Sequence, residues 1–194
     1  MLTRCSQWLA FSSLLVLFTL AGCGSVWTPS AAKAVPQPVS STGITSTINN
    51  ESTVKFTLSG GNSGSYTVYA ALPTSKLRHG HREFTIDVEH AGMSVFLVFY
   101  GYQGPGTYTL AEDINGGDVH IALGKDTPSW DLSLQLKARC TMTVQSDIPT
   151  QSVGLDRMKG SFSCPLLFSS APNHPEKPVS VHNGSFDVAI IVES

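Results

Sequence analysis

The sequence predicts an all-β protein whose folded part is an antiparallel β-sandwich of jelly-roll or immunoglobulin-like kind, with a closed barrel as the alternative. Beyond position 50, hydrophobic residues alternate with polar residues at a period of two. Gly, Pro and Asn interrupt the chain at short intervals, as they do between short strands. No window longer than about ten residues favours a helix. Roughly nine or ten short strands with this spacing are typical of a sandwich.

The first three strands follow directly from this alternation, and a fourth follows from a continuous apolar run. Residues 54–58 and 66–70 are expected to form a hairpin around the glycine-rich turn at 59–64. Residues 84–88 alternate in the same way. The next run, Met93–Tyr100, is apolar at nearly every position and rich in β-branched and aromatic residues. It therefore predicts a central strand that is covered on both sides.

Shorter runs in the second half of the chain predict the remaining strands. Asn115, Gly116 and Gly117 indicate a turn between two of them. The expected strands cover residues 108–110, 119–123, 130–136, 140–144, 158–164 and 185–192.

An apolar segment near the N-terminus predicts where the protein resides. Arg4 precedes the run Leu9–Leu20, which has the layout of a secretory signal and is short for a membrane span. The run ends in Leu20-Ala21-Gly22-Cys23, which resembles a bacterial lipobox. The resemblance implies that the signal is removed before Cys23, and that Cys23 carries a diacylglyceryl group and an acyl chain as a stable anchor. The alternatives are an ordinary signal peptide with an incidental cysteine, or a single membrane helix.

This layout divides the chain into three parts. Residues 1–22 are the expected signal peptide, residues 23–50 a lipidated cysteine with a flexible linker, and residues 51–194 the sandwich domain. In such lipoproteins an Asp after the cysteine marks the inner membrane, so Gly24 and Ser25 favour the outer membrane or the cell surface. The scattered charges, 12 Lys and Arg against 14 Asp and Glu, leave no basic stripe for a nucleic acid partner.

The four cysteines divide by compartment. Cys5 lies in the signal and Cys23 is the expected lipid attachment site, which leaves Cys140 and Cys164 in an oxidising exterior. We therefore predict a disulfide between Cys140 and Cys164. The alternative use, a thiol redox site, usually has the closer spacing Cys-x-x-Cys.

Two short segments contain the residue types of a metal site. His79 and His81 would point the same way on a strand, where Glu83, His90 or His120 could add a ligand. The alternative is a solvated, basic loop.

The second segment has the oxygen ligands and glycines of a calcium-binding turn. Its candidate ligands are Asp113, Asn115 and Asp118, but the closing acidic ligand of an EF-hand is missing. An Asn-Gly turn between two strands explains the same residues without an ion.

Aromatic residues suggest a third kind of site. Tyr100, Tyr102 and Trp130 are candidates for a rim that binds sugar rings or a partner surface. The alternative, which we favour, is that Trp130 and Tyr108 pack in the core or cap the sandwich.

Four motifs extend the resemblance into the folded part of the chain. They are Gly104–Leu110, Cys140–Val144, Lys159–Cys164 and Asn183–Val188, and they are similar to those of uncharacterised β-rich bacterial lipoproteins. This similarity implies a β-rich fold and a location in the cell envelope, and it implies no activity.

The sequence offers little support for catalysis. It contains no Gly-x-Ser-x-Gly elbow, no evident carboxylate pair for glycosidase chemistry and no phosphate-binding loop. We therefore expect a lipid-anchored envelope protein that acts as a non-catalytic binding or structural module for an envelope protein or glycan. It would need no cofactor besides the lipid on Cys23. The alternatives are a metal or small-ligand carrier and an extracytoplasmic hydrolase.

Overall fold

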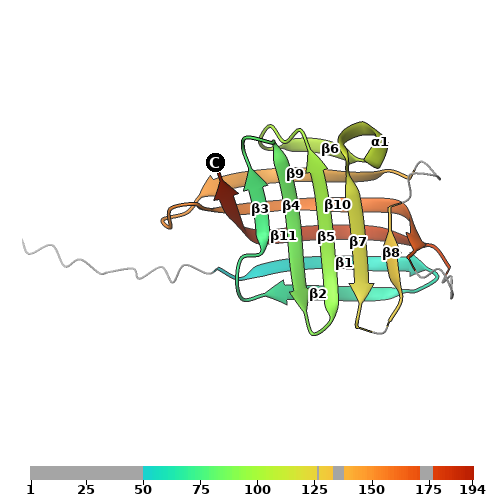
Figure 1. Cartoon of the computed structure of the whole chain (residues 1–194). Helices are drawn as coiled ribbons and strands as arrows, with labels where there is room; N and C mark the ends of the chain where they lie inside the picture. Colours follow the sequence, from blue (N-terminus) through green and yellow to red (C-terminus); the bar gives the residue numbers. More distant parts are fainter. Residues whose placement is uncertain (1–49, 126, 133–137, 171–176) are drawn as a thin grey trace, which may run out of the picture. The chain divides into compact units, whose positions relative to one another are not determined.

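The computed structural model describes residues 50–125, 127–132, 138–170 and 177–194 (Figure 1). The predicted signal peptide, the expected lipid attachment site Cys23 and all of the predicted linker except Asn50 lie outside the described residues. Within the described ranges the chain forms eleven strands and one helical turn, α1 (Glu112–Asn115). The strands are β1 (Ser52–Gly60), β2 (Gly64–Ala70), β3 (Ser75–Arg78), β4 (Glu83–His90), β5 (Met93–Tyr100), β6 (Gly106–Leu110), β7 (Asp118–Leu123), β8 (Ser129–Asp131), β9 (Cys140–Pro149), β10 (Leu155–Ser169) and β11 (Val179–Glu193).

The strands form two layers that cross steeply (Figure 1). The layer that we call the back layer has the order β2-β1-β11-β10-β9-β6, and the front layer has the order β3-β4-β5-β7-β8. Alternate side chains from both layers point between them and form one hydrophobic core. This arrangement confirms the predicted β-sandwich.

The two longest strands join the layers. β11 pairs with β1 and β10 in the back layer, and its end, Ile190–Glu193, pairs in parallel with β3. β10 pairs with β9, and its residues Phe168 and Ser169 pair with β8 in the front layer. The expectation of a purely antiparallel sandwich is therefore wrong at the β3–β11 pairing, because the end of β11 turns the corner and meets β3 in the same direction.

The outer face of β5 departs from the prediction that both of its faces are covered. Val95, Leu97 and Phe99 are fully buried, as expected for a strand between β4 and β7. Phe96 and Val98, which point the other way, are only partly buried. Both faces of β5 are therefore apolar, but within the described residues only the inner face is fully buried.

Three further segments differ from the sequence-based expectation. The alternation of apolar and polar residues does not predict β3, because this strand is too short to show a period. The turn expected at Asn115–Gly117 begins with α1, which ends at Gly116 in the left-handed conformation (φ 60°). The strand expected over residues 130–136 is β8, and residues 133–137 lie outside the described residues.

Two copies of the sequence Gly-Ser-Phe face each other at the centre of the back layer. Gly160-Ser161-Phe162 in β10 runs antiparallel to Gly184-Ser185-Phe186 in β11, so that each glycine lies opposite the phenylalanine of the other copy. Both rings are buried. A Cβ atom would lie 2.3 Å from the opposite ring on the glycine of β10 and 2.7 Å from it on the glycine of β11. The rings thus occupy the space that the glycines leave free. They also cover two positions where the strands have no side chain of their own to pack.

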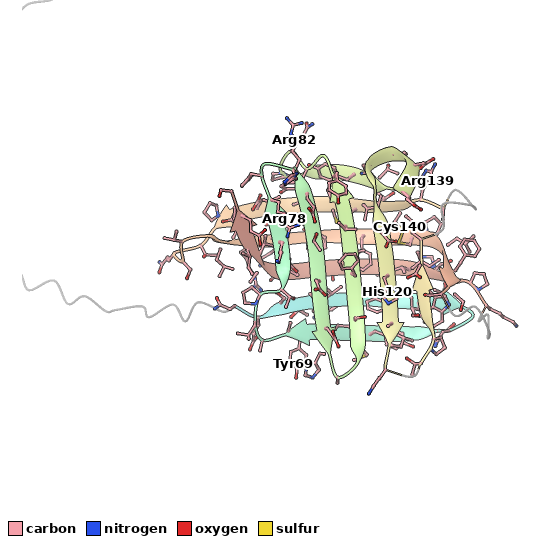
Figure 2. All side chains as sticks on the ribbon, in the orientation of Figure 1. Tyr69, Arg78, Arg82, His120, Arg139 and Cys140 are labelled. Carbon is pink, nitrogen blue, oxygen red and sulfur yellow. A yellow bond between two sulfur atoms is a disulfide. The ribbon has the colours of Figure 1, made fainter. Side chains whose placement is uncertain are left out.

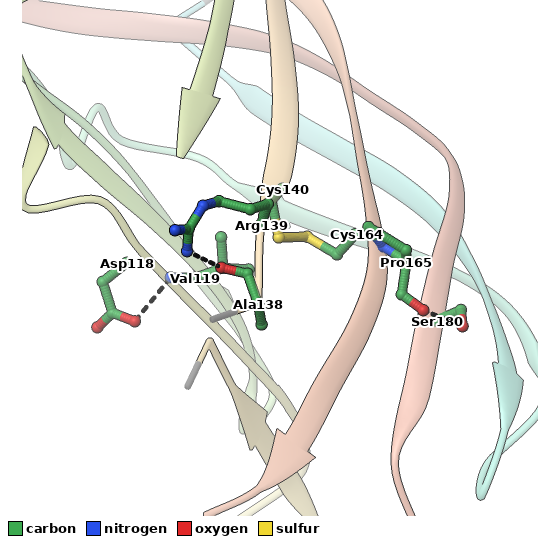
Figure 3. The surroundings of a disulfide bond; sticks show 8 residues. All are labelled: Asp118, Val119, Ala138, Arg139, Cys140, Cys164, Pro165 and Ser180. Carbon is green, nitrogen blue, oxygen red and sulfur yellow. Dashed lines mark hydrogen bonds between the residues drawn. A yellow bond between two sulfur atoms is a disulfide. The ribbon is translucent and has the colours of Figure 1, made fainter. Parts of the chain in front are cut away.

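A disulfide joins Cys140 at the start of β9 to Cys164 in β10, as predicted (Figure 3). The two Cα atoms are 4.3 Å apart. The register pairs Thr141 with Ser163, so the two cysteines are cross-strand neighbours. Their exposed fractions are 1% and 0%, and the bond is therefore part of the core. Such burial is typical of a structural disulfide and not of a redox-active thiol pair.

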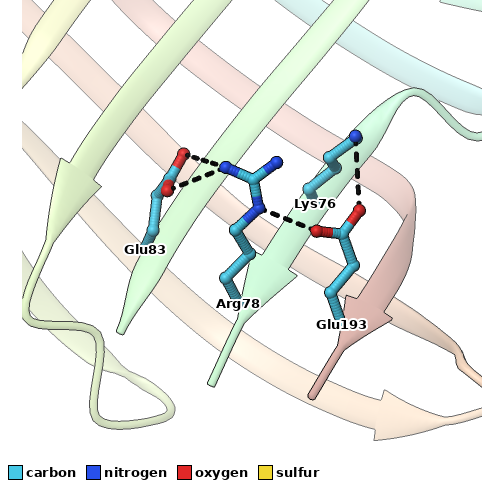
Figure 4. Close-up of polar contacts among 4 residues, drawn as sticks. All are labelled: Lys76, Arg78, Glu83 and Glu193. Carbon is cyan, nitrogen blue, oxygen red and sulfur yellow. Dashed lines mark hydrogen bonds and ion pairs between the residues drawn. The ribbon is translucent and has the colours of Figure 1, made fainter. Parts of the chain in front are cut away.

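Charged side chains fasten the end of β11 to the front layer (Figure 4). Arg78 lies between two carboxylates, with Nε donating to Glu193 at 2.7 Å and Nη1 donating to Glu83 at 3.1 Å. Lys76 Nζ lies 3.3 Å from the other oxygen of Glu193. The hydrogen bonds from Arg78 and Lys76 lower the pKa of Glu193. Because these side chains are well exposed, each pair adds little stability, and the network serves mainly to fix β3 between β4 and β11.

Candidate functional site

The candidate site is a groove on the outer face of the back layer, over β1, β11, β10 and β9. Its volume of about 370 Å³ lies within the range of pockets that bind small ligands. The polar side chains of the lining alternate with core residues along each strand and so face away from the core. The polar members of the lining are Thr53, Lys55, Gln145, Lys159, Ser185 and Asp187.

The floor of this groove contains Gly160, Ser185 and Phe186 from the paired Gly-Ser-Phe motifs. Because both phenylalanine side chains are buried in the core, only backbone and the short side chains of Ser161 and Ser185 face outward here. Longer side chains on the flanking strands, Lys55 on β1 and Gln145 on β9, stand beside this floor. The phenylalanines of the motif therefore fill the core on one face of the sheet. Its glycines and serines leave the other face without large side chains.

The lining carries two lysines against one aspartate. Burial acts to raise the pKa of Asp187, but hydrogen bonds from Arg157 and Lys159 outweigh this effect and lower the pKa. Lys159 Nζ lies 3.1 Å from Asp187 Oδ2. Lys55, in contrast, forms no ion pair within the described part of the chain. An anion in the groove would therefore meet an ammonium group that no carboxylate already holds.

A row of polar side chains crosses the outer face of the back layer, and two of its members, Lys55 and Ser185, also line the groove. All six members are exposed or partly exposed, and five of them carry hydroxyl groups. Adjacent strands lie about 4.8 Å apart, so six strands span about 24 Å. The register places the following residues opposite one another, in the order β2, β1, β11, β10, β9, β6: Thr67, Lys55, Ser185, Ser161, Thr143 and Thr107.

His79 and His81, the first candidate metal ligands, lie in the turn between β3 and β4 and not on a strand. The backbone N–H of His81 donates to the carbonyl of Arg78 at 3.2 Å, and both histidines are exposed in the turn that also contains Arg82. The expectation that strand alternation points the two rings the same way is therefore wrong, because the chain reverses here. In the described ranges, no group of three or more His, Cys, Asp or Glu side chains is placed to hold a metal ion.

The side chains of the second candidate metal segment have separate partners inside the protein. Asp113 accepts a hydrogen bond from Arg139 at 2.8 Å. Asn115 Nδ2 donates to the carbonyl of Thr109 at 3.0 Å, and Asp118 accepts the backbone N–H of the next residue at 2.8 Å. The structure thus gives each of the three side chains a local structural role, and it does not bring them together as ligands.

Burial separates the three candidate rim residues. Trp130 is fully buried, and its Nε1 donates to the carbonyl of Lys177 at 3.1 Å. Tyr102 is 7% exposed and donates its hydroxyl to Asp147 at 3.0 Å. Tyr100 is 49% exposed. The favoured expectation that Trp130 packs in the core therefore agrees with the structure, and Tyr102 packs there as well and cannot serve as a rim.

The side chains that a Ser–His–Asp hydrolase would need are divided between the two layers. On the back layer, His182 Nε2 is hydrogen-bonded to Ser59 Oγ at 3.0 Å, with no carboxylate partner in the described residues. His120, which lies on β7 in the front layer (Figure 2), pairs with Asp131. Asp131 also accepts a hydrogen bond from Ser170. Neither place shows the order of serine, histidine and carboxylate that activates a nucleophile.

His120 and Asp131 form an ion pair that responds to pH. The hydrogen bond to Asp131 raises the pKa of His120. Burial alone would raise the pKa of Asp131, but hydrogen bonds from His120 and Ser170 lower it overall. The stability from His120 is therefore present below its unfolded pKa of about 6.5 and is lost as the pH rises through its folded pKa. The stability from Asp131 is present above its unfolded pKa of about 3.9 and is lost as the pH falls through its folded pKa.

We expect His120→Gln to lower the melting temperature by about 2 °C more at about pH 5 than at about pH 8.5. The two side chains are 36% and 39% exposed, so solvent screening limits the contribution of the pair to about 1 kcal/mol or less. Thermal melts followed by circular dichroism at the two pH values measure the difference. His182→Gln is the matched control, because His182 lacks a carboxylate partner in the described residues. An equal effect of His120→Gln at both pH values would contradict the assignment.

Sequence reasoning missed the residues of the groove, Lys55, Gln145 and Lys159. They are far apart in the chain, and only the order β1-β11-β10-β9 brings them together. The repeated Gly-Ser-Phe at 160–162 and 184–186 is the signal in the sequence that points to this place.

The helical turn α1 has four residues. No helix in the described ranges has the length and apolar character needed to cross a membrane. Comparisons of the chain with protein families, with curated protein sequences and with solved structures found no match.

Proposed function

We propose that this chain is a lipid-anchored protein of the bacterial cell envelope whose sandwich acts as a non-catalytic binding module. The observation that carries the binding role is the positively charged, hydroxyl-lined groove around Lys55 on the back layer. The anchor is a diacylglyceryl group and an acyl chain on Cys23, and it rests on the lipobox sequence Leu20–Cys23.

The position of the groove supports a binding role. It lies over β1, β11 and β10, each of which pairs with a neighbour on both sides. Side chains on such strands keep their positions better than side chains on loops, which favours recognition of a ligand without rearrangement. The separate hydrogen bonds of His182 and His120 favour this role over the hydrolase alternative.

The anchor is tested by the intact mass of the full chain after expression in a bacterium and purification from its membranes. We expect a mature protein that begins at Cys23 and carries the added mass of its acyl chains. Cys23→Ala is expected to abolish the acyl mass and to remove most of the protein from the membrane fraction. A wild-type product that is soluble, unacylated and cut elsewhere would refute the anchor.

The binding role is tested by co-sedimentation of the purified protein with isolated cell envelopes. We expect Lys55→Glu to reduce the affinity by about tenfold, since it places a like charge where an anionic ligand would bind. Lys125→Glu makes the same charge change in an exposed turn after β7 and is expected to bind as the wild type does. Equal losses in both variants, or no binding by the wild type, would overturn the groove as the binding site.

A further inference from the structure

We propose that the groove binds a glycan chain whose sugars carry carboxylate groups, with one carboxylate held by Lys55. This inference rests on the proposed function, because it names the class of ligand for the same groove. It follows from three observations: the charge of the groove, its hydrogen-bonding groups and the length of the polar row that passes through it.

The charge of the groove selects an acidic ligand. Lys55 is exposed and forms no ion pair within the described residues, so its ammonium group is available to a carboxylate. Lys159 contacts Asp187, but an ammonium group has three N–H donors and can take a further acceptor. A ligand carboxylate beside Lys55 would therefore gain a charge-assisted hydrogen bond without breaking the Lys159–Asp187 pair.

The remaining polar groups of the lining fit sugar hydroxyls. Thr53 and Ser185 carry hydroxyls, and Gln145 carries an amide, so each can both donate and accept a hydrogen bond. A sugar hydroxyl has the same double capacity. The one aromatic ring of the lining, Phe186, is 3% exposed, so recognition here depends on hydrogen bonds and charge and not on stacking.

The length of the polar row favours a chain over a single sugar. The row runs from Thr67 on β2 to Thr107 on β6 and spans about 24 Å. A small anion at Lys55 would not reach the hydroxyls at the far end of the row, where those of Thr107 and Thr143 are hydrogen-bonded to each other at 3.0 Å. A chain of several sugars laid across the strands would reach hydroxyls on both sides of Lys55.

The surroundings of the groove favour a carboxylate over a phosphate. Phosphate sites commonly use several free backbone N–H groups, whereas one ammonium group can hold a carboxylate through a charge-assisted hydrogen bond. The central strands of the groove, β1, β11 and β10, have neighbours on both sides, and their backbone groups serve the sheet.

Titration calorimetry of the purified full chain with tetragalacturonate tests the inference. The fully methyl-esterified form of the same tetrasaccharide is the matched control, because it keeps the chain and removes the charges. We expect the ester to bind at least about tenfold more weakly, and we expect added salt to weaken binding of the free acid. Lys55→Gln should also weaken that binding by about tenfold, whereas Lys125→Gln should not. Because Lys55 is exposed, its variant should melt within a few degrees of the wild type.

The outcomes separate this inference from the proposed function. Binding to isolated envelopes, with equal or no binding of the acid and its ester, would refute the acidic glycan and leave the binding module standing. Absence of binding to envelopes and to both tetrasaccharides would refute both proposals. Inorganic phosphate is the third probe. If phosphate displaces tetragalacturonate at equal concentration, the site recognises phosphate, and the assignment to a carboxylate is wrong.

Discussion

Gly184→Ala is expected to lower the melting temperature by about 6 to 12 °C, which corresponds to a loss of about 3 kcal/mol in the free energy of unfolding. The added Cβ would lie 2.4 Å from the carbonyl oxygen of Phe162 and 2.7 Å from its ring. Non-bonded atoms do not approach so closely, so β10 and β11 would have to separate or the ring would have to leave the core. Thermal unfolding followed by far-ultraviolet circular dichroism measures the effect.

The opposite member of the motif pair should behave in the same way. A Cβ on Gly160 would lie 2.2 Å from the carbonyl oxygen of Thr143 and 2.3 Å from the ring of Phe186. At each glycine a backbone oxygen takes part in the clash. Replacing the opposite ring by a smaller side chain is therefore not expected to relieve it. Phe162→Leu in the Gly184→Ala background should therefore fail to restore stability. Full recovery in this double variant would show that the backbone can move and that the ring alone sets the limit.

Gly80→Ala is the matched control for both glycine variants. Gly80 lies in the turn between β3 and β4, and no atom lies within 4 Å of the position of its added Cβ. We expect a change of about 0.5 kcal/mol or less. A loss as large as that of Gly184→Ala would mean that the motif pair has no special role in the stability of the sheet.

The prediction of the strands succeeded where one face meets the core and the other meets solvent. In β1, buried Val54, Phe56 and Leu58 alternate with more exposed neighbours, and this contrast is visible in the sequence. The prediction failed for the outer face of β5, because Phe96 is apolar although it has only partial cover. A single sequence records the polarity of a side chain, and the cover over it depends on the whole fold. β3 is too short for either argument.

The candidate site was harder to predict than the fold. The disulfide can be predicted because the other two cysteines have separate expected places, in the signal peptide and at the lipid attachment site. Only Cys140 and Cys164 then remain to pair. The groove depends on which strands are neighbours, and β1 and β11 come from opposite ends of the folded part. Local periodicity contains no information on such long-range pairing. The candidate ligands His79 and His81 were misplaced for the opposite reason, since a strand pattern was extended through a turn.

Removal of the disulfide is the second change with a large expected effect. In Cys140→Ala/Cys164→Ala, we expect a loss of about 3 to 4 kcal/mol in the free energy of unfolding and a fall of about 6 to 16 °C in the melting temperature. The two cysteines are 24 residues apart in sequence, and their bond restricts the unfolded chain over this segment. Urea unfolding of the double variant beside the oxidised wild type measures the loss. Equal stabilities would mean that the bond contributes nothing to the fold.

Reduction of the native protein provides an independent test of the same bond. Because both cysteines are buried, a reductant should reach the disulfide only after β9 and β10 separate. We therefore expect thiol labelling under reductant to be slow in the native protein and fast in urea. The rate in the native protein should increase in Gly160→Ala, because that substitution weakens contacts between β10 and its neighbours. Rapid labelling of the folded wild type would instead identify an accessible, redox-active pair, and the structural role assigned to the disulfide would be wrong.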